Sequence, residues 1–171
     1  MQLVDKDINL VLIADDPGRA SILQQTMETS GIRGVIRRID PGSAAIDCAR
    51  RSGAYCNKLL PDLIFFDITD TTERTTEVLS EVAFGEARSE VPVVLLTNSD
   101  SPALLEDGRI DDSQAVMFSP TSLPSFVGKM KNGKRTAFFR ALKTLYQYGP
   151  ILVRLPVTAR RRDYGITALS A

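Results

Sequence analysis

The chain lacks histidine and tryptophan and has only two cysteines. Without histidine, the Ser/His and Cys/His nucleophile pairs and every form of acid–base catalysis by imidazole are excluded within it. A zinc site would have to be assembled from two thiols and carboxylates, so we interpret Cys48 and Cys56 as reduced cysteines in or near a helix. No apolar run reaches the roughly 20 residues that cross a bilayer. These absences predict a cytoplasmic protein without a membrane span.

Charges cancel over the whole chain but are separated along it, with 21 basic and 21 acidic residues in total. From Lys131 onward, nine lysines and arginines stand against one acid, Asp163, so this end has a formal charge of +8 and the preceding residues −8. The separation suggests an acidic domain with a basic appendage. The three arginines at 160–162 have no aromatic residues between them, so we do not expect this chain to bind nucleic acid.

Apolar runs alternate five times with segments of helical character. The expected strands cover residues 8–14, 34–40, 63–67, 91–97 and 115–119, and the helices between them are expected to begin near Pro17, Ser43, Thr71 and Ser101. The first, third and fourth runs are apolar throughout, as in parallel strands that helices cover on both faces. The alternation predicts an α/β fold, a doubly wound, five-stranded parallel sheet of the flavodoxin-like kind.

Two further helical segments follow the fifth strand. Residues 123–130 have apolar side chains at the spacing of a fifth helix, and residues 138–146 mark a second, amphipathic helix that ends near Gly149. Either the domain itself or another chain must cover the apolar face of the second helix, and the latter case allows a homodimer through the C-terminal helices. We therefore expect a domain at residues 1–131 and, at residues 132–171, a helical extension with a basic tail that suits a linker to a further domain.

Polar side chains stand where the expected strands end. Asp15 and Asp16 follow the first strand, Asp67 ends the third, and Thr97 ends the fourth. Because parallel strands present their carboxyl ends at one edge of a sheet, these groups are expected to converge there. Three carboxylates repel one another unless a cation lies among them, and Mg²⁺ is a hard ion that prefers oxygen ligands. We expect Mg²⁺ on Asp15, Asp16, Asp67 and the backbone carbonyl of Thr69, with the Thr97 hydroxyl facing a bound anion; the alternative is that the acids only cap helices and turns.

In this order, the residues resemble the receiver domain of two-component response regulators. The landmarks are the acidic pair, Asp67 as phosphoacceptor, Thr97, and Ser119-Pro120 after the fifth strand, over about residues 8–131. The resemblance implies that a partner histidine kinase donates a phosphoryl group to Asp67 with the help of Mg²⁺, and that a switch surface responds through Thr97. Because this chain has no histidine, any phosphohistidine must come from the partner. We expect a signalling module and not an enzyme.

Two departures from the family pattern concern charge and switching. The family has lysine where this chain has Ser119, and a hydroxyl brings no positive charge to an aspartyl phosphate. The aromatic switch position is Val116. We therefore predict a degenerate receiver that acts mainly by protein–protein interaction with a kinase or another signalling protein. The alternatives are a conventional receiver phosphorylated on Asp67 and a flavodoxin-like nucleotide-binding protein, for which the acidic loop DDPGRAS is a poor phosphate site.

Overall fold

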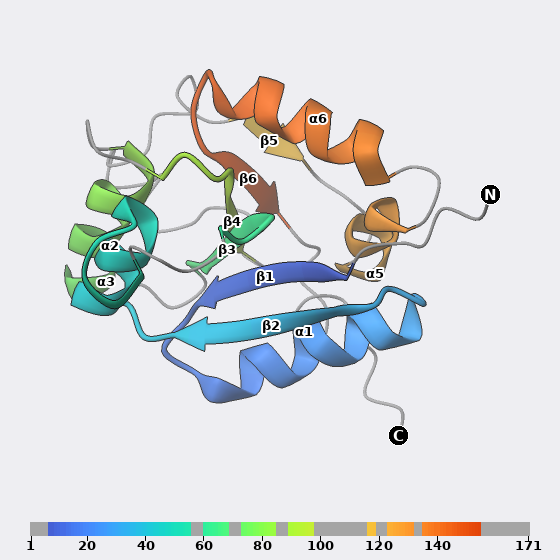
Figure 1. The fold of residues 1–171 in the computed structure, drawn as a ribbon, viewed down its shortest axis with the longest axis horizontal. Helices are drawn as coiled ribbons and strands as arrows, with labels where there is room; N and C mark the ends of the chain where they lie inside the picture. Colours follow the sequence, from blue (N-terminus) through green and yellow to red (C-terminus); the bar gives the residue numbers. More distant parts are fainter. Residues whose placement is uncertain are drawn as a thin grey trace.

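Six parallel strands form one sheet in the order β2-β1-β3-β4-β6-β5 (Figure 1). A computed structural model describes residues 7–55, 60–68, 73–84, 89–97, 116–118, 123–131 and 135–154. The strands are β1 (Ile8–Ile13), β2 (Gly34–Ile39), β3 (Leu63–Asp67), β4 (Val93–Thr97), β5 (Val116–Phe118) and β6 (Ile151–Arg154). The order β2-β1-β3-β4 is that of flavodoxin-like sheets. In these sheets, all strands are parallel and the order in which they are added reverses between β1 and β3. The predicted doubly wound parallel fold is confirmed.

The three strands predicted to be apolar throughout form the centre of the core. In β1, β3 and β4, nearly every side chain is buried, because helices lie on both faces of the sheet. Among the largest fully buried side chains are Phe65 and Phe66 of β3 and Leu10 and Leu12 of β1. The burial of these runs explains their uniform hydrophobicity in the sequence.

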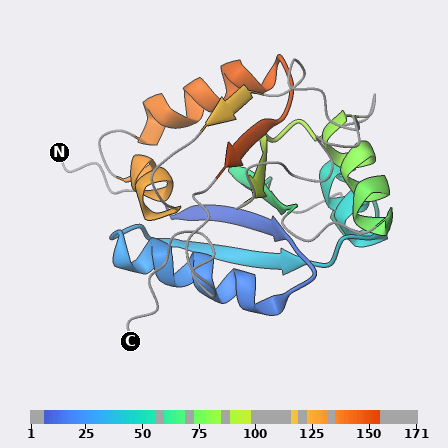
Figure 2. The same ribbon diagram turned by 180° about the vertical axis from the view of Figure 1, so that it is seen from behind.

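Five helices accompany the sheet in the described part of the chain. They are α1 (Pro17–Thr29), α2 (Ser43–Arg50), α3 (Glu73–Leu79), α5 (Leu123–Val127) and α6 (Arg135–Tyr146). A π-helical turn at Ser80–Phe84 continues α3, and a 3-10 turn at Gly128–Met130 continues α5. Contacts join α1 to α5 and α2 to α3, and these two pairs lie on different sides of the molecule in Figures 1 and 2. The helix predicted near Ser101 lies outside the described residues.

Local signals explain where α1 begins and ends. Asp16 is the N-cap residue, and its carboxylate accepts a hydrogen bond from the backbone N–H of Gly18 at 2.8 Å. Pro17 occupies the first helical position, where its missing N–H costs nothing. After the helix, Gly31 adopts a φ of +74°, a conformation that residues with a Cβ disfavour. This fixed start brings the first turn of α1 directly after β1.

β6 was not predicted, because residues 150–154 were assigned to the tail. The strand lies between β4 and β5 (Figure 1) and pairs with both: Leu95 and Met117 are each opposite Leu152. Its three apolar residues, Ile151 to Val153, are fully buried. The sheet thus has one strand more than expected, and the boundary predicted at residue 131 does not separate this strand from the domain.

The apolar face of α6 packs against the rest of the same chain. Phe138 meets Phe126 of α5 edge to face, with ring centroids 5.6 Å apart, and Leu142 is almost fully buried. The phenol of Tyr146 donates a hydrogen bond of 2.7 Å to the backbone carbonyl of Ser89, just before β4. Of the two occupants expected for this face, the structure favours the domain itself.

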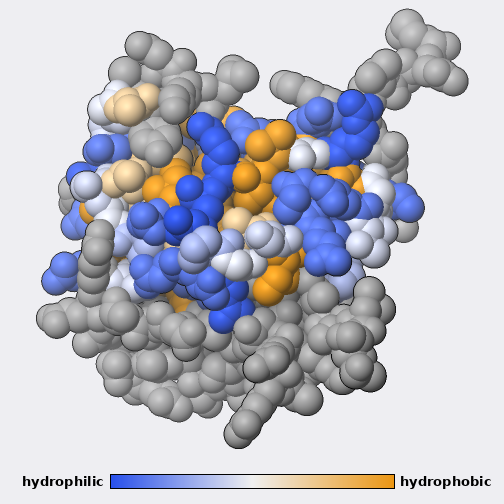
Figure 3. All heavy atoms as spheres, turned by 90° about the horizontal axis from the view of Figure 1, so that it is seen from below, coloured by the Kyte–Doolittle hydropathy of each residue, from blue (hydrophilic) through white to orange (hydrophobic). Residues whose placement is uncertain are grey.

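The surface on the side of α1 and the edge strand β2 contains both polar and apolar side chains. Figure 3 views the molecule from below Figure 1, on the side of α1, and shows hydrophilic side chains around and between several apolar ones in the described part. β2 is an edge strand and presents Val35, which is 56% exposed. Within the described residues, no helix is long and apolar enough to cross a membrane.

Candidate functional site

Three carboxylates meet at the carboxyl ends of β1 and β3. Asp15 and Asp16 follow β1, Asp67 ends β3, and all three line one small hollow of about 40 Å³. We call these three residues the acidic edge. Arg19, Pro41 and Thr75 complete the lining of the hollow. The structure therefore brings the acids of the sequence prediction together, and it adds a cation that the prediction did not include.

That cation is Arg19, which forms an ion pair with Asp67. Its Nε lies 3.3 Å from Oδ2 of Asp67, and only 9% of the Arg19 side chain and 7% of the Asp67 side chain are exposed. Opposite charges attract more strongly where solvent is excluded, and each charge then depends on the other to offset its lost hydration. Asp67, the predicted phosphoacceptor, is thus engaged in an ion pair with Arg19 of the same chain.

The other two acids are oriented toward solvent. Asp15 is exposed, and the side chain of Asp16 is 66% exposed and lies 4.0 Å from Arg19 Nε. Asp16 also serves as the N-cap of α1, as the alternative interpretation of these acids expected. Among the described residues, no group of three acids, cysteines or histidines is arranged to hold a metal ion. Arg19, at Oδ2 of Asp67, is a cation that the predicted Mg²⁺ site does not include, so a metal at this edge would share Asp67 with Arg19.

Thr97 and Arg154 stand side by side at the same edge of the sheet. Thr97 ends β4, is fully buried, and is opposite Arg154 in the register of β4 and β6. The Nε of Arg154 is buried and has no hydrogen-bond partner within the described part of the chain. The strand next to β4 therefore ends with a positively charged residue, whereas the sequence predicts the hydroxyl of Ser119 in that position.

Two predicted site residues, Thr69 and Ser119, lie outside the described residues, so their roles stay predictions. The same holds for the side chain of Val116, the expected switch position. The described part of β5 ends at Phe118, which is opposite Val153 of β6. The strand before Ser119 is consequently separated from β4 by β6.

Arg19 and Arg154 were not among the predicted site residues, although the sequence around each of them has an unusual feature. Arg19 is in the first turn of α1, where the helix dipole disfavours a cation unless an anion is near. Arg154 ends an apolar run, ILVR, that has the same form as the other buried strands. In both cases, the signal indicates an unusual charge but not its partner.

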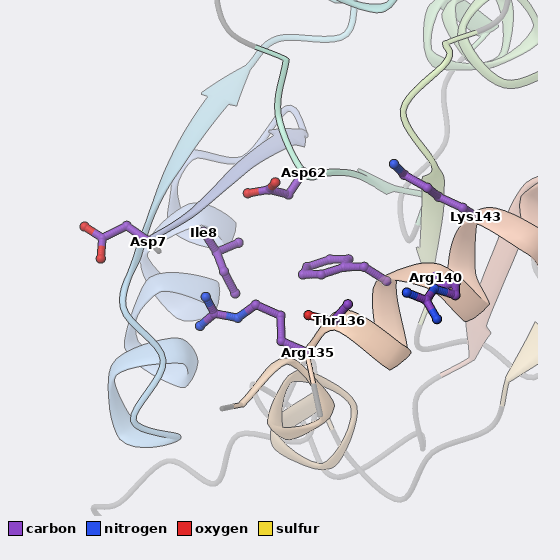
Figure 4. Close-up of a pocket in the computed structure, with 8 residues that line it drawn as sticks. Asp7, Ile8, Asp62, Arg135, Thr136, Arg140 and Lys143 are labelled. Atoms are coloured by element: carbon purple, nitrogen blue, oxygen red, sulfur yellow. The ribbon is translucent and has the colours of Figure 1, made fainter. Parts of the chain in front are cut away.

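A larger hollow of about 380 Å³ lies near the amino ends of β1 and β3 (Figure 4). Its acids are engaged within the chain: Asp62 Oδ2 accepts a hydrogen bond from the backbone N–H of Asn9 at 2.8 Å, and Asp7 pairs with Arg33. α6 contributes the remaining polar lining, which is Arg135, Thr136, Arg140 and Lys143. This hollow is separate from the acidic edge and carries much of the positive charge of α6.

Comparison with known proteins was made for both sequence and structure. No protein-family model matches the chain. The response regulator Rcp1 of Synechocystis sp. is 29% identical over 90 residues, which are 53% of this chain and 61% of the relative. The probable methanogenesis regulatory protein FilR2 of Methanothrix harundinacea is 27% identical over 113 residues, 66% of this chain and 72% of the relative. The first match thus spans less than two thirds of the relative's length.

Solved structures give similar matches. The phosphorylated cyanobacterial phytochrome response regulator RcpA is 20% identical, with a TM-score of 0.47 over 84% of this chain and 94% of the other. The receiver domain of the sensor histidine kinase PA1611 from Pseudomonas aeruginosa PAO1, which has a magnesium ion in its active-site cleft, is 17% identical, with a TM-score of 0.45 over 83% and 99%. The predicted resemblance to response regulators is confirmed by the two sequence relatives.

Proposed function

We propose that the chain is a receiver domain for signal transduction that acts mainly through protein–protein recognition and not as an enzyme. Its similarity to response regulators supports the receiver class. The observation that carries the degenerate form of this proposal is the ion pair at Asp67, whose carboxylate is buried against Arg19. A carboxylate held in this way is a weaker nucleophile and is less accessible to a phosphoryl donor.

The second candidate is a conventional receiver, because the retained acids still line one hollow with Asp67. In that reaction, the P–N bond of a phosphohistidine on the partner kinase breaks and a P–O bond to an Asp67 oxygen forms. Arg19 must then release Oδ2 or turn toward the new phosphoryl oxygens. Arg154, the cation of β6, is opposite Thr97 in the sheet and is a candidate for contact with the phosphoryl group.

The proposal includes the binding of a divalent metal, but only weak binding at the acidic edge. Asp15 and Asp16 are exposed and able to meet a cation from solvent, whereas Asp67 is engaged with Arg19. We therefore propose that Mg²⁺ binds weakly at this edge. The Thr69 carbonyl is kept as a predicted ligand.

The proposed partner is a histidine kinase or another signalling protein, and the proposed location is the cytoplasm. A homodimer through the C-terminal helices is not part of the proposal, because the apolar face of α6 packs within the chain. The flavodoxin-like nucleotide-binding alternative is also set aside. Its phosphate loop would have to coincide with Asp15 and Asp16, which repel a phosphate.

Incubation with Mg²⁺ and a small phosphodonor, followed by intact-mass measurement, tests the proposal. We expect little or no phosphoryl incorporation into folded protein, because Arg19 shields Asp67. The Asp67→Asn variant gives the background at other sites. Rapid, near-complete labelling that is absent in this variant would instead establish the conventional receiver.

A further inference from the structure

Arg19 occupies an unfavourable position for a cation unless a nearby anion compensates it. It stands in the first turn of α1, which contains no acidic residue. The backbone N–H groups of that turn already carry a partial positive charge. Within the described part of the chain, Asp67 lies nearer to its Nε, at 3.3 Å, than Asp16, the N-cap of its own helix, at 4.0 Å. The side chain therefore connects the start of α1 to the end of β3.

The ion pair between Arg33 and Asp7 allows a comparison with the Arg19–Asp67 pair, because the two pairs differ in burial. Arg33 and Asp7 have the same separation, 3.3 Å from Nε to a carboxylate oxygen, but their side chains are 75% and 56% exposed. Water screens that pair, whereas the Arg19–Asp67 pair is more than nine-tenths buried. Equal distance with unequal burial makes the exposed pair a matched control.

The carboxylate of Asp67 already has a cation beside it, the guanidinium of Arg19. The guanidinium of Arg19 lies 3.3 Å from Oδ2 of Asp67, and its positive charge repels a second cation that approaches the same carboxylate. We propose that Arg19 is the resident cation of the acidic edge, and that its guanidinium, in place of a divalent metal, balances the charge of Asp67. This inference deepens the proposed function by naming the group that closes the site, but it holds whether or not the chain is a signalling receiver.

A titration with Mg²⁺ alone, followed by amide chemical shifts at Asp15, Asp16 and Asp67, tests the inference. In the intact chain, we expect weak binding. In Arg19→Gln, the three carboxylates lose their resident cation, and we expect Mg²⁺ to bind about tenfold more tightly, a modest effect for one charge removed a few ångströms away.

Arg33→Gln is the matched control, because it removes the same charge from the exposed pair. We expect its Mg²⁺ affinity to equal that of the intact chain. Equal affinities in the intact chain and in Arg19→Gln would overturn the proposal. An increase of the same size in Arg33→Gln would also overturn it, because net charge alone would then explain the effect.

A double-mutant cycle gives a second readout that does not depend on metal. Asp67→Asn leaves the buried Arg19 without this counter-ion, so we expect its urea midpoint to fall clearly below that of the intact chain. The double variant Arg19→Gln/Asp67→Asn should be no less stable than Asp67→Asn alone. Strictly additive losses would contradict the proposal. Neither experiment uses a kinase or a phosphodonor, so failure here is distinguishable from failure of the proposed function.

Discussion

At the scale of single residues, Tyr146 connects two parts of the chain that are distant in sequence. Its ring is buried, and its hydroxyl donates a hydrogen bond to the Ser89 carbonyl at 2.7 Å. Ser89 is buried as well, and its side chain accepts a hydrogen bond from the backbone N–H of Val91. The phenol therefore satisfies a carbonyl that solvent does not reach, and it fixes the end of α6 against the segment that leads into β4.

We predict that Tyr146→Phe lowers the free energy of unfolding by about 1 kcal/mol, because a buried carbonyl loses its donor while the ring packing is kept. Urea denaturation measures the difference. Tyr148→Phe is the control, since Tyr148 is 76% exposed, and it should leave stability within about 0.5 kcal/mol of the intact chain. Equal effects of the two substitutions would show that the buried hydrogen bond contributes nothing.

Individual site residues were predictable to the extent that topology determines their place. Asp15, Asp16 and Asp67 follow apolar runs, and parallel strands bring the ends of such runs to one edge. The position of Arg19 depends on something different, the direction of a long side chain at the start of a helix. Nothing in the spacing of residues gives that direction, so the ion pair became apparent only from the structure.

At the scale of elements, β6 is the main addition to the predicted fold. Its run of apolar residues is short, and it directly follows Gly149-Pro150, a dipeptide typical of turns and loops. The two strands that flank it, β4 and β5, are separated from it by many residues. A local pattern reports burial but not pairing partners, so the place of β6 inside the sheet was not predictable from the sequence.

We predict that Val153→Ala in β6 lowers the free energy of unfolding by about 2 kcal/mol, because two buried methyl groups are removed from the core. Val35→Ala in β2 makes the same chemical change where the side chain is 56% exposed, and it should cost less than about 1 kcal/mol. Urea denaturation of both variants provides the comparison. If the two losses are equal, β6 is not part of the core in solution.

At the scale of the whole molecule, the described helices and strands share a single apolar core. Residues from β1, β3, β4, α5, α6 and β6 all belong to one buried cluster. A cluster of this kind favours all-or-none unfolding, since no large group of contacts breaks independently of the others. The predicted division at residue 131 would instead place α6 and β6 in a separate unit.

We predict one cooperative thermal transition for the full chain, with coincident midpoints from far-ultraviolet circular dichroism and from tyrosine fluorescence. A chain that ends at residue 131 should lack this transition, because β4 then has no neighbour on its β6 side. A control chain that ends after residue 154 should retain it. Two separate transitions in the full chain would support the division at residue 131.

The position of β6 also determines the order of events during synthesis. β5 leaves the ribosome before β6, yet its described pairing in the sheet is with β6. Until residues 151–154 are free to pair, β4 remains an open edge whose backbone groups are able to pair with another chain. A ribosome stalled before this point would therefore hold an aggregation-prone nascent chain, because β6, the last of the described strands along the chain, joins β4 to β5.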